Sequence, residues 1–407
     1  MSNPVANVGN QINNTVGDKI NNLINNGVTN KGQEILNNVA NTISSGMNNL
    51  KGTIAENVNK ITGPKNVLAE NFSIVLALTI TFIILLIMFF LSKTFRVSTT
   101  LDSFNLYKNF LSLSSYPFND DEAKKVKLKD CYIASAYNPT LNQYQILDYT
   151  SIDIFNEVYR AGPIYLEFNI FNSEYGENAI PIVSNGYKNG NWKLTADTVT
   201  FEECIKSLAE NAFTVLQDDK TGVLNPDDPI FIGLNLNVEN NVYCLDTISD
   251  ILVNYFKNRF LDHKYSFQQN DLSNITMGEL EGKVCIIASE GFEGSKLEEL
   301  VNGCWDNSNI RHIHYSELDK PNLDVNTWQS HNRSGLTIVT PNKEGDFYST
   351  NYDTDIAFKC GCQFIALNYQ IIDKHMDIYI NKFKNKSIRV KPKRLTEIQV
   401  NDSNDNK

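Results

Sequence analysis

The sequence predicts an α/β protein, built as a barrel or a doubly wound sheet, that follows one membrane-spanning helix and an N-terminal arm. Three observations lead to this prediction. Short β-rich runs alternate with helical patterns through residues 128–395. An apolar stretch long enough to cross a bilayer occupies residues 71–92. Residues 1–70 differ from both regions, because they are rich in Asn and carry few charges.

The N-terminal arm, residues 1–70, carries apolar side chains at helical spacing. They recur every three or four positions, from Val5 to Val28 and again from Val39 to Ile61, against a background of Asn, Thr, Gly and Ser. An amphipathic helix would gather them on one side, where they could contact lipid or other copies of the arm. A partly disordered arm of low complexity is the alternative, and the spacing favours the helix.

The apolar stretch from residue 72 to residue 91, FSIVLALTITFIILLIMFFL, contains no charged side chain. Its length suits the hydrocarbon core of a bilayer, and a helix that is apolar on every side is rare in soluble proteins. Its late start and the lack of a small-residue cleavage site argue against a secretory signal. Lys93 and Arg96 follow it closely, which favours a cytoplasmic C-terminal domain by the positive-inside rule.

Charge and cysteine content restrict the function class and the compartment. The chain has 36 Lys and Arg against 47 Asp and Glu, a net charge of −11, which argues against a nucleic-acid partner. Most of the seven Cys residues sit in apolar runs, which predicts buried free thiols in a reducing compartment. Cys360 and Cys362 could bind a metal, but no second Cys or His pair flanks them at the spacing of a zinc finger.

The elements after the apolar stretch follow in order. Residues 93–127 are expected to form a linker, with a short helix at 100–113 and a charged segment at 118–127. Runs typical of strands cover residues 130–137, 163–171, 179–184, 229–237, 284–289, 336–340 and 364–369. Helical periodicity covers residues 201–213 and 248–260, and residues 396–407 are expected to form a disordered tail.

The last part of the chain carries ordered motifs. They are Ser349 to Tyr352, Gly361-Cys362-Gln363, Ala366 to Gln370, Met376-Asp377, Phe383 and Lys391-Pro392, with Met277 to Val284 upstream. In this order they resemble the Y half of eukaryotic-type phosphoinositide-specific phospholipase C, here about residues 277–395. Segments of the X half, about residues 128–255, follow a similar order: Ile133 to Pro139, Leu166 to Asn169, Ile180 to Tyr187 and Pro229 to Asn237.

The resemblance implies a distorted (β/α)8 barrel of the TIM type, with its site at the carboxyl ends of the strands. It also implies cleavage of a phosphoinositide by two His residues, with Ca²⁺ held by carboxylates and an Asn. The two His positions fall on Tyr137 and Asn185. The metal positions form a degenerate set in which only the first two keep the family's residue: Asn138, Glu167, Asn169 and Asn235.

These replacements predict a domain without the family's activity. Tyr and Asn cannot exchange protons near neutral pH as His does, and two lost carboxylates weaken a calcium site. The resemblance places candidate substrate-binding residues at Lys283, Ser349, Asn351 and Tyr352, but Ile338 and Thr340 stand where an Arg and a Tyr would hold the inositol phosphates. We therefore expect a phospholipase-C-like binding or structural module with no cofactor.

Two alternatives stay open. One is an active phosphodiesterase with altered residues, which would use Ca²⁺ and combine Glu167 with Tyr137 or a later His. The other is a module that binds a phosphoinositide or another anionic phospholipid without hydrolysing it. The expected partner in every case is a lipid bilayer, with a protein partner or self-assembly through the arm. The Asn bias is compatible with a membrane component of a large DNA virus particle.

Two further groups of residues were candidates for binding. His312 and His314 would share one face of a possible strand, so they could form a metal pair, although such residues are more often satisfied by hydrogen bonds. The stretch KFKNKSIRVKPKR, residues 382–394, holds seven cationic side chains. It could contact anionic headgroups or an acidic partner, or form the solvated edge of a strand.

Overall fold

The computed structural model describes residues 67–106, 115–187, 192–217, 222–269, 271–305, 309–342 and 348–396, together with residues 41 and 45. The predicted arm therefore lies almost entirely outside the described residues, and so does the predicted tail. The chain divides into two compact units, Met1–Phe95 and Arg96–Lys407.

Helix α3 (Val67–Phe104) contains the predicted membrane span. Within the described residues, Leu76–Phe104 is the one helical segment that is long and apolar enough to cross a membrane, judged by length and composition. Its apolar side chains are exposed, with Leu78 at 64% and Phe82 at 62%. The short helix expected at 100–113 is not separate, because no Gly or Pro interrupts α3 before Phe104.

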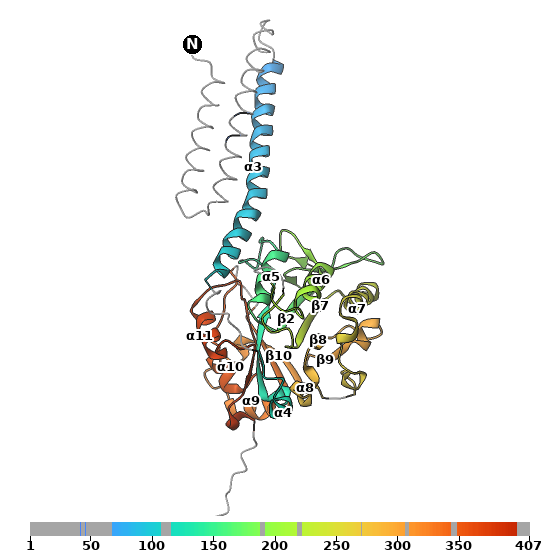
Figure 1. Cartoon of the computed structure of the whole chain (residues 1–407). Helices are drawn as coiled ribbons and strands as arrows, with labels where there is room; N and C mark the ends of the chain where they lie inside the picture. The colour runs from blue at the N-terminus through green and yellow to red at the C-terminus, as the bar shows by residue number, and fades with distance from the viewer. Residues whose placement is uncertain are drawn as a thin grey trace, which may run out of the picture. The chain divides into compact units, whose positions relative to one another are not determined.

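The second unit is a nearly closed barrel of eight parallel strands, in the order β10-β11-β12-β1-β2-β7-β8-β9 (Figure 1). The strands are β1 (Cys131–Tyr137), β2 (Tyr165–Asn172), β7 (Ile230–Asn237), β8 (Val284–Ala288), β9 (Val301–Cys304), β10 (Ile310–His314), β11 (Leu336–Thr340) and β12 (Phe364–Leu367). No ladder joins β9 to β10 among the described residues. At this seam the ring of Trp305 stacks on His312 with centroids 3.9 Å apart.

Short antiparallel strands distort the barrel. β13 (Ile388–Val390) pairs with the amino half of β1, and β3 (Pro181–Val183) pairs with the carboxyl half of β2. β6 (Val199–Thr200) extends β3, and β4 (Gly186–Tyr187) forms a two-stranded ribbon with β5 (Trp192–Lys193). β3 and β6 therefore lie beside the carboxyl half of β2, and the β4–β5 ribbon follows β3 in the chain.

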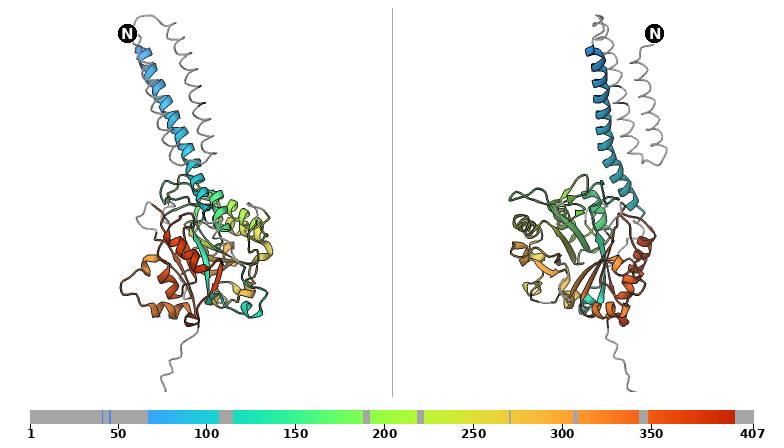
Figure 2. Two further views of the ribbon diagram at one scale, coloured as in Figure 1. Left: turned by 60° about the vertical axis from the view of Figure 1, so that its left-hand side comes forward. Right: turned by 180° about the vertical axis from the view of Figure 1, so that it is seen from behind.

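Helices cover the outside of the barrel, as the two further views in Figure 2 also show. They are α4 (Asp121–Lys124), α5 (Ile152–Arg160), α6 (Phe201–Asn211), α7 (Val242–Phe256), α8 (Met277–Leu280), α9 (Val325–Asn332), α10 (Asp355–Cys360) and α11 (Lys374–Phe383). Their starts follow local capping rules. Thr200 and Glu203 form a capping box at α6, and Asn241 caps α7 at the amide of Cys244.

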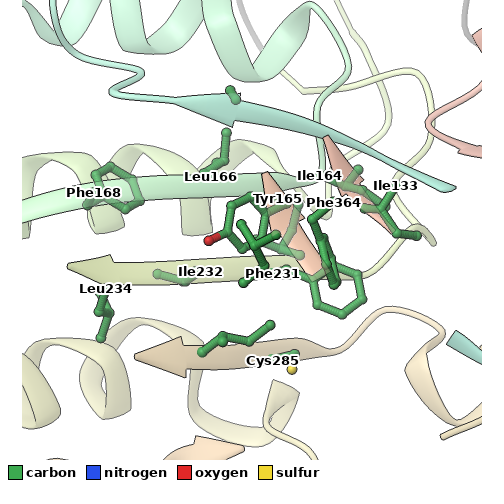
Figure 3. Close-up of a cluster of buried hydrophobic side chains, with 14 of the residues drawn as sticks. Ile133, Ile164, Tyr165, Leu166, Phe168, Phe231, Ile232, Leu234, Cys285 and Phe364 are labelled. Carbon is green, nitrogen blue, oxygen red and sulfur yellow. The ribbon is translucent and has the colours of Figure 1, made fainter. Parts of the chain in front are cut away.

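Aromatic side chains fill the amino half of the barrel interior (Figure 3). The ring of Phe364 lies 5.0 Å from Tyr165 and 5.2 Å from Phe231, centroid to centroid. Gly233 leaves room for the Tyr165 hydroxyl, which a Cβ at this position would meet. Full burial of such a side chain contributes about 2 to 3 kcal/mol. Alternate β2 residues such as Phe168 face the outer helices instead.

The expectation of an α/β barrel is confirmed, and the doubly wound sheet is excluded by the nearly closed strand order. The seven predicted strands are all present. Strands β4, β5, β6, β9 and β13 were missed, because they are only two to four residues long, and β9 contains Asn and Gly. Helix α7 begins at Val242, earlier than expected, because Asn241 caps it.

Candidate functional site

The candidate site lies inside the barrel, towards the carboxyl ends of β1, β2 and β7. Side chains alternate across a strand, so Tyr165, Glu167 and Asn169 of β2 all face the interior. The parallel pairing of β2 with β7 sets Asn169 beside Asn235. Asn138, which follows β1, adopts the left-handed conformation with φ at 45°, which Asn tolerates better than most residues.

Four of the predicted positions form an amide network, which we define as Asn138, Asn169, Asn185 and Asn235. Asn169 Nδ2 donates to Asn138 Oδ1, and Asn235 Nδ2 donates to Asn169 Oδ1 at 2.6 Å. Asn138 Nδ2 in turn donates to Asn185 Oδ1 at 3.4 Å. All are buried except Asn235, which is partly exposed. The structure thus brings together three predicted metal positions and one predicted His position, as uncharged partners of one another.

Surrounding loops hold this network in place. Asn185 Nδ2 donates to the carbonyl of Gln145 at 2.9 Å, and Gln370 Nε2 donates to the carbonyl of Asn138 at 3.4 Å. The loop that carries Gln145 is itself organised by the buried Asp148, which accepts hydrogen bonds from the Gln143 and Tyr144 amides. Contacts from several loops therefore fix the amides in their present orientation.

Glu167 is fully buried, and both of its carboxyl oxygens have protein partners. The Tyr165 hydroxyl donates to Oε2 at 2.9 Å, and His312 Nε2 lies 3.1 Å from each of the two oxygens. The imidazole is held flat against Trp305. The sequence did not reveal this contact, although the alternation of His312 and His314 with Ile313 did place them on one strand face.

Tyr137, at the first predicted His position, is buried beside Glu167. Its hydroxyl makes no hydrogen bond of normal geometry among the described residues. Burial and the nearby Glu167 carboxylate raise the pKa of Tyr137 far above its ordinary value, against a smaller opposite effect of the Asn169 and Asn138 amides. The phenol therefore stays protonated at neutral pH.

The predicted substrate-binding residues do not form one group. Asn351 Nδ2 donates to the carbonyl of Asn368, and the backbone amide of Asn368 donates to Asn351 Oδ1. Tyr352 is buried, and its hydroxyl donates to the carbonyl of Val339 at 3.1 Å. Ser349 is also buried. The side chains of Asn351 and Tyr352 therefore bind the backbone of neighbouring segments, whereas the Ser349 hydroxyl has no hydrogen-bond partner among the described residues. Lys283 precedes β8, at the amino end of the barrel, and its Nζ lies 3.5 Å from the carbonyl of Asn258.

The other candidate metal ligands are His314, with its neighbour His312, and the pair Cys360 and Cys362. His314 Nδ1 lies 3.1 Å from Thr340 Oγ1 and 3.3 Å from the carbonyl of Pro341. Among the described residues, no three His, Cys, Asp or Glu side chains gather as a metal site would require. All seven Cys are buried free thiols, and burial raises the pKa of Cys360 to about 11, which opposes the thiolate that a metal needs.

The basic stretch, residues 382–394, lies at the amino end of the barrel, because β13 pairs with the start of β1. Lys384, Lys386 and Lys393 are exposed. Lys391 is buried, with Nζ 3.3 Å from the carbonyl of Asn332, and desolvation lowers its pKa to about 7. The stretch therefore combines a solvated surface with one lysine that belongs to the interior.

Comparisons with known proteins agree with this fold. Residues 282–391 match the family described as phosphatidylinositol-specific phospholipase C, Y domain. The crystal structures of PLC21 from S. officinalis and from L. pealei each superpose with a TM-score of 0.57, at 19% identity over 70% of this chain. This chain spans 39% and 40% of the length of those two chains. A search of the curated proteins found no match. The barrel has the fold of a phosphoinositide-specific phospholipase C.

The fold implies a calcium ion, and the donor set does not fit one. Calcium takes about six to eight oxygen ligands, several of them carboxylates. Here the metal positions provide one carboxylate and three amides. The amides are hydrogen-bonded to one another, and the Glu167 oxygens are bound by His312 and Tyr165. A divalent cation would have to break these contacts and would gain a single negative charge in return.

Proposed function

We propose that this chain is a membrane-anchored, phospholipase-C-like protein that does not hydrolyse phosphoinositides and acts as a binding or structural module. The observation that carries the proposal is the amide network together with the engaged Glu167 carboxylate. Hydrolysis by the family's route needs proton transfer at two positions and charge stabilisation by a metal. Tyr137 and Asn185 provide no such proton transfer, and the donor set offers little to a cation.

Anchoring is supported by α3 and by the loops at the carboxyl end of the barrel. These loops expose an aromatic rim, which we define as Leu147, Tyr187, Trp192 and Tyr348, with 59 to 70% of each residue accessible. Leu147 bonds to the backbone of Leu194, and Tyr348 packs on Tyr144, so the three loops form one surface. Exposed Tyr and Trp side chains suit the boundary between lipid and water. The proposed partner of this surface is a bilayer.

A second candidate function is phosphodiester cleavage with altered residues. The contact between Glu167 and His312 supports it, because a carboxylate that orients an imidazole is a common arrangement for a general base. This candidate needs the substrate to reach His312, whose side chain is 12% exposed.

Hydrolysis by the full chain in vesicles separates the two candidates. The vesicles would contain phosphatidylinositol or its bisphosphate, with millimolar Ca²⁺ or a chelator, and soluble inositol phosphate would be measured. We expect no release above that of vesicles without protein. Release that is lost in Glu167→Gln and His312→Gln but kept in the matched control His314→Gln would overturn the proposal in favour of the enzyme.

The lipid contact of the aromatic rim can be measured with brominated lipids, which quench nearby tryptophan. The chain has three Trp residues, none in the apolar stretch, and Trp192 is 67% exposed whereas Trp305 is 5% exposed. We expect strong quenching that Trp192→Phe removes. Quenching that is unchanged in this variant would show that the rim does not reach the bilayer. Adding phosphatidylinositol bisphosphate to the vesicles tests headgroup binding without turnover.

A further inference from the structure

The end of α3, residues 96–104, packs against the barrel. This segment belongs to the second compact unit, which begins at Arg96. Arg96, Thr100 and Phe104 follow one another at intervals of four, so they share one side of the helix. Thr100 and Phe104 are buried, and Leu101 packs against the barrel core. The end of the apolar helix is therefore built into the barrel.

Thr100 joins α3 to the loop between β1 and α5, residues 138–151. Its hydroxyl donates to Asn142 Oδ1 at 2.5 Å and accepts a hydrogen bond from Gln143 Nε2 at 3.1 Å. Thr100 and Asn142 are both buried, so the hydroxyl uses its donor and an acceptor position inside the protein. Separation of the helix from the loop would break both hydrogen bonds.

Arg96 joins α3 to the same loop through Asp148. Arg96 Nη1 lies 3.4 Å from Asp148 Oδ1, and the guanidinium carbon lies 5.2 Å from the ring centroid of Tyr144. The buried Asp148 carboxylate also accepts hydrogen bonds from Asn142 Nδ2, at 3.1 and 3.2 Å. Arg96, Thr100, Asn142 and Asp148 thus connect two positions of α3 with two positions of the loop. We call these four residues the helix clamp.

The clamped loop forms one wall of the candidate site. It begins at Asn138 of the amide network, and its Gln145 carbonyl accepts the hydrogen bond from Asn185 Nδ2. The Leu147 amide donates to the carbonyl of Leu194 at 2.8 Å, and the Leu194 amide donates to the carbonyl of Asn185 at 2.7 Å. Displacement of the loop would therefore remove partners from Asn185 and loosen the amide network.

We propose that the helix clamp controls the opening of the candidate site. While Arg96 and Thr100 hold the loop, it stays against the amide network, and the site opens when the loop leaves the end of α3. Direct contacts connect α3 with Asn185, which allows a change at the helix end to alter the site. The inference rests on the proposed function, because it takes α3 as the anchor, but it requires neither hydrolysis nor a particular lipid.

Hydrogen exchange of the full chain in detergent, measured by mass spectrometry, tests the clamp. In the parent chain, residues 138–151 should exchange faster than the buried strand β8, because the loop opens without global unfolding. Thr100→Val keeps the side-chain volume and removes the hydroxyl, so loop exchange should become about tenfold faster. Arg96→Gln should increase it about twofold, because the ion pair is partly exposed. Peptides that contain Leu194 should follow the loop.

Ser103→Ala is the matched control on the same helix. The Ser103 hydroxyl donates to the carbonyl of Thr100 at 2.6 Å, within α3, so loop exchange should stay as in the parent chain. Arg96→Gln carries the test if Thr100→Val does not fold.

Three results would overturn the proposal. Equal exchange of the loop and β8 in the parent chain would mean that the loop opens only on global unfolding. Loop exchange that neither Thr100→Val nor Arg96→Gln changes would mean that the loop opens without leaving the clamp. Faster loop exchange without a change at Leu194 would separate the loop from the site. These measurements use neither vesicles nor substrate, so failure of the clamp and failure of the proposed function are distinguishable.

Discussion

The two ends of the barrel differ in how well their buried polar side chains are hydrogen-bonded. At the carboxyl end, the amides of Asn169 and Asn235 bond to each other, and Glu167 has two protein partners. At the amino end, Asp228 is equally buried and has no hydrogen-bond partner of normal geometry among the described residues. The carboxyl end is thus internally satisfied, whereas the opposite end holds a buried carboxyl group whose pKa is raised to about 7 by desolvation.

The difference shows how amide side chains can satisfy one another in a buried site. An Asn in place of a carboxylate provides an N–H donor and carries no charge, so neighbouring amides can bond to one another. At Asp228 the Tyr116 amide and the Ser387 hydroxyl favour the charged carboxylate, but desolvation outweighs them and raises the pKa of the carboxyl group to about 7. Three substitutions test this comparison, from the largest expected effect to the smallest.

His312→Ala should have the largest effect, because it leaves the buried Glu167 carboxyl with Tyr165 as its remaining partner. We expect the free energy of unfolding to fall by about 3 kcal/mol, as measured by urea denaturation of the full chain in detergent. His314→Ala is the matched control on the same strand. Its partners are the neutral Thr340 hydroxyl and the Pro341 carbonyl, so a loss of about 1 kcal/mol is expected. Equal losses would contradict the special role of the Glu167 contact.

Asp228→Asn should change how stability depends on pH. The folded-state pKa of Asp228 is raised to about 7, so the folded protein keeps a proton that the unfolded chain releases at lower pH. The contribution is therefore full in acid and is lost as the pH rises through about 7. We expect the variant to lack this fall and to exceed the parent chain by about 2 kcal/mol at about pH 8. A parallel pH profile for the two proteins would refute the raised pKa of Asp228.

Restoring carboxylates at the other end should recreate a dependence on calcium. In Asn169→Asp with Asn235→Glu, two donors of the amide network disappear and two charges approach Glu167. We expect a loss of about 1 to 2 kcal/mol in chelator, partly recovered in millimolar Ca²⁺. The parent chain should melt at the same temperature with and without Ca²⁺. A calcium response of the parent would show that its amides still admit the ion.

The strand pattern could be predicted from the sequence, whereas the assignment of individual site positions by resemblance stays a prediction. Hydrophobic periodicity located β1, β2 and β7, and the ordered motifs aligned Tyr137, Asn169 and Asn185 with the family's positions. The prediction was strong there because it depended on local pattern and on neighbours in the chain. Lys283 shows the limit of such alignment, since a resemblance in sequence does not say at which end of a strand a side chain lies.

Contacts between distant segments could not be predicted. His312 is 145 positions from Glu167, and no local signal connects β10 with β2. Asp228 is buried beside Tyr116 and Ser387, which are distant from it in the chain, so its raised pKa could not be predicted from its neighbours in the sequence. Such effects arise because desolvation depends on everything that surrounds a group, whatever its position in the chain.

The sequence by itself determined the α/β architecture, the apolar helix and the identity of the residues at the positions where the resemblance expects catalytic and metal-binding side chains. The tertiary structure alone decided which groups those residues contact: it joined the amides of Asn138 and Asn169 in a network, gave Glu167 an imidazole partner and buried the Asp228 carboxyl group. The physical reason is that periodic burial is encoded in adjacent residues, whereas the pairing of buried polar groups is settled where strands from distant parts of the chain meet.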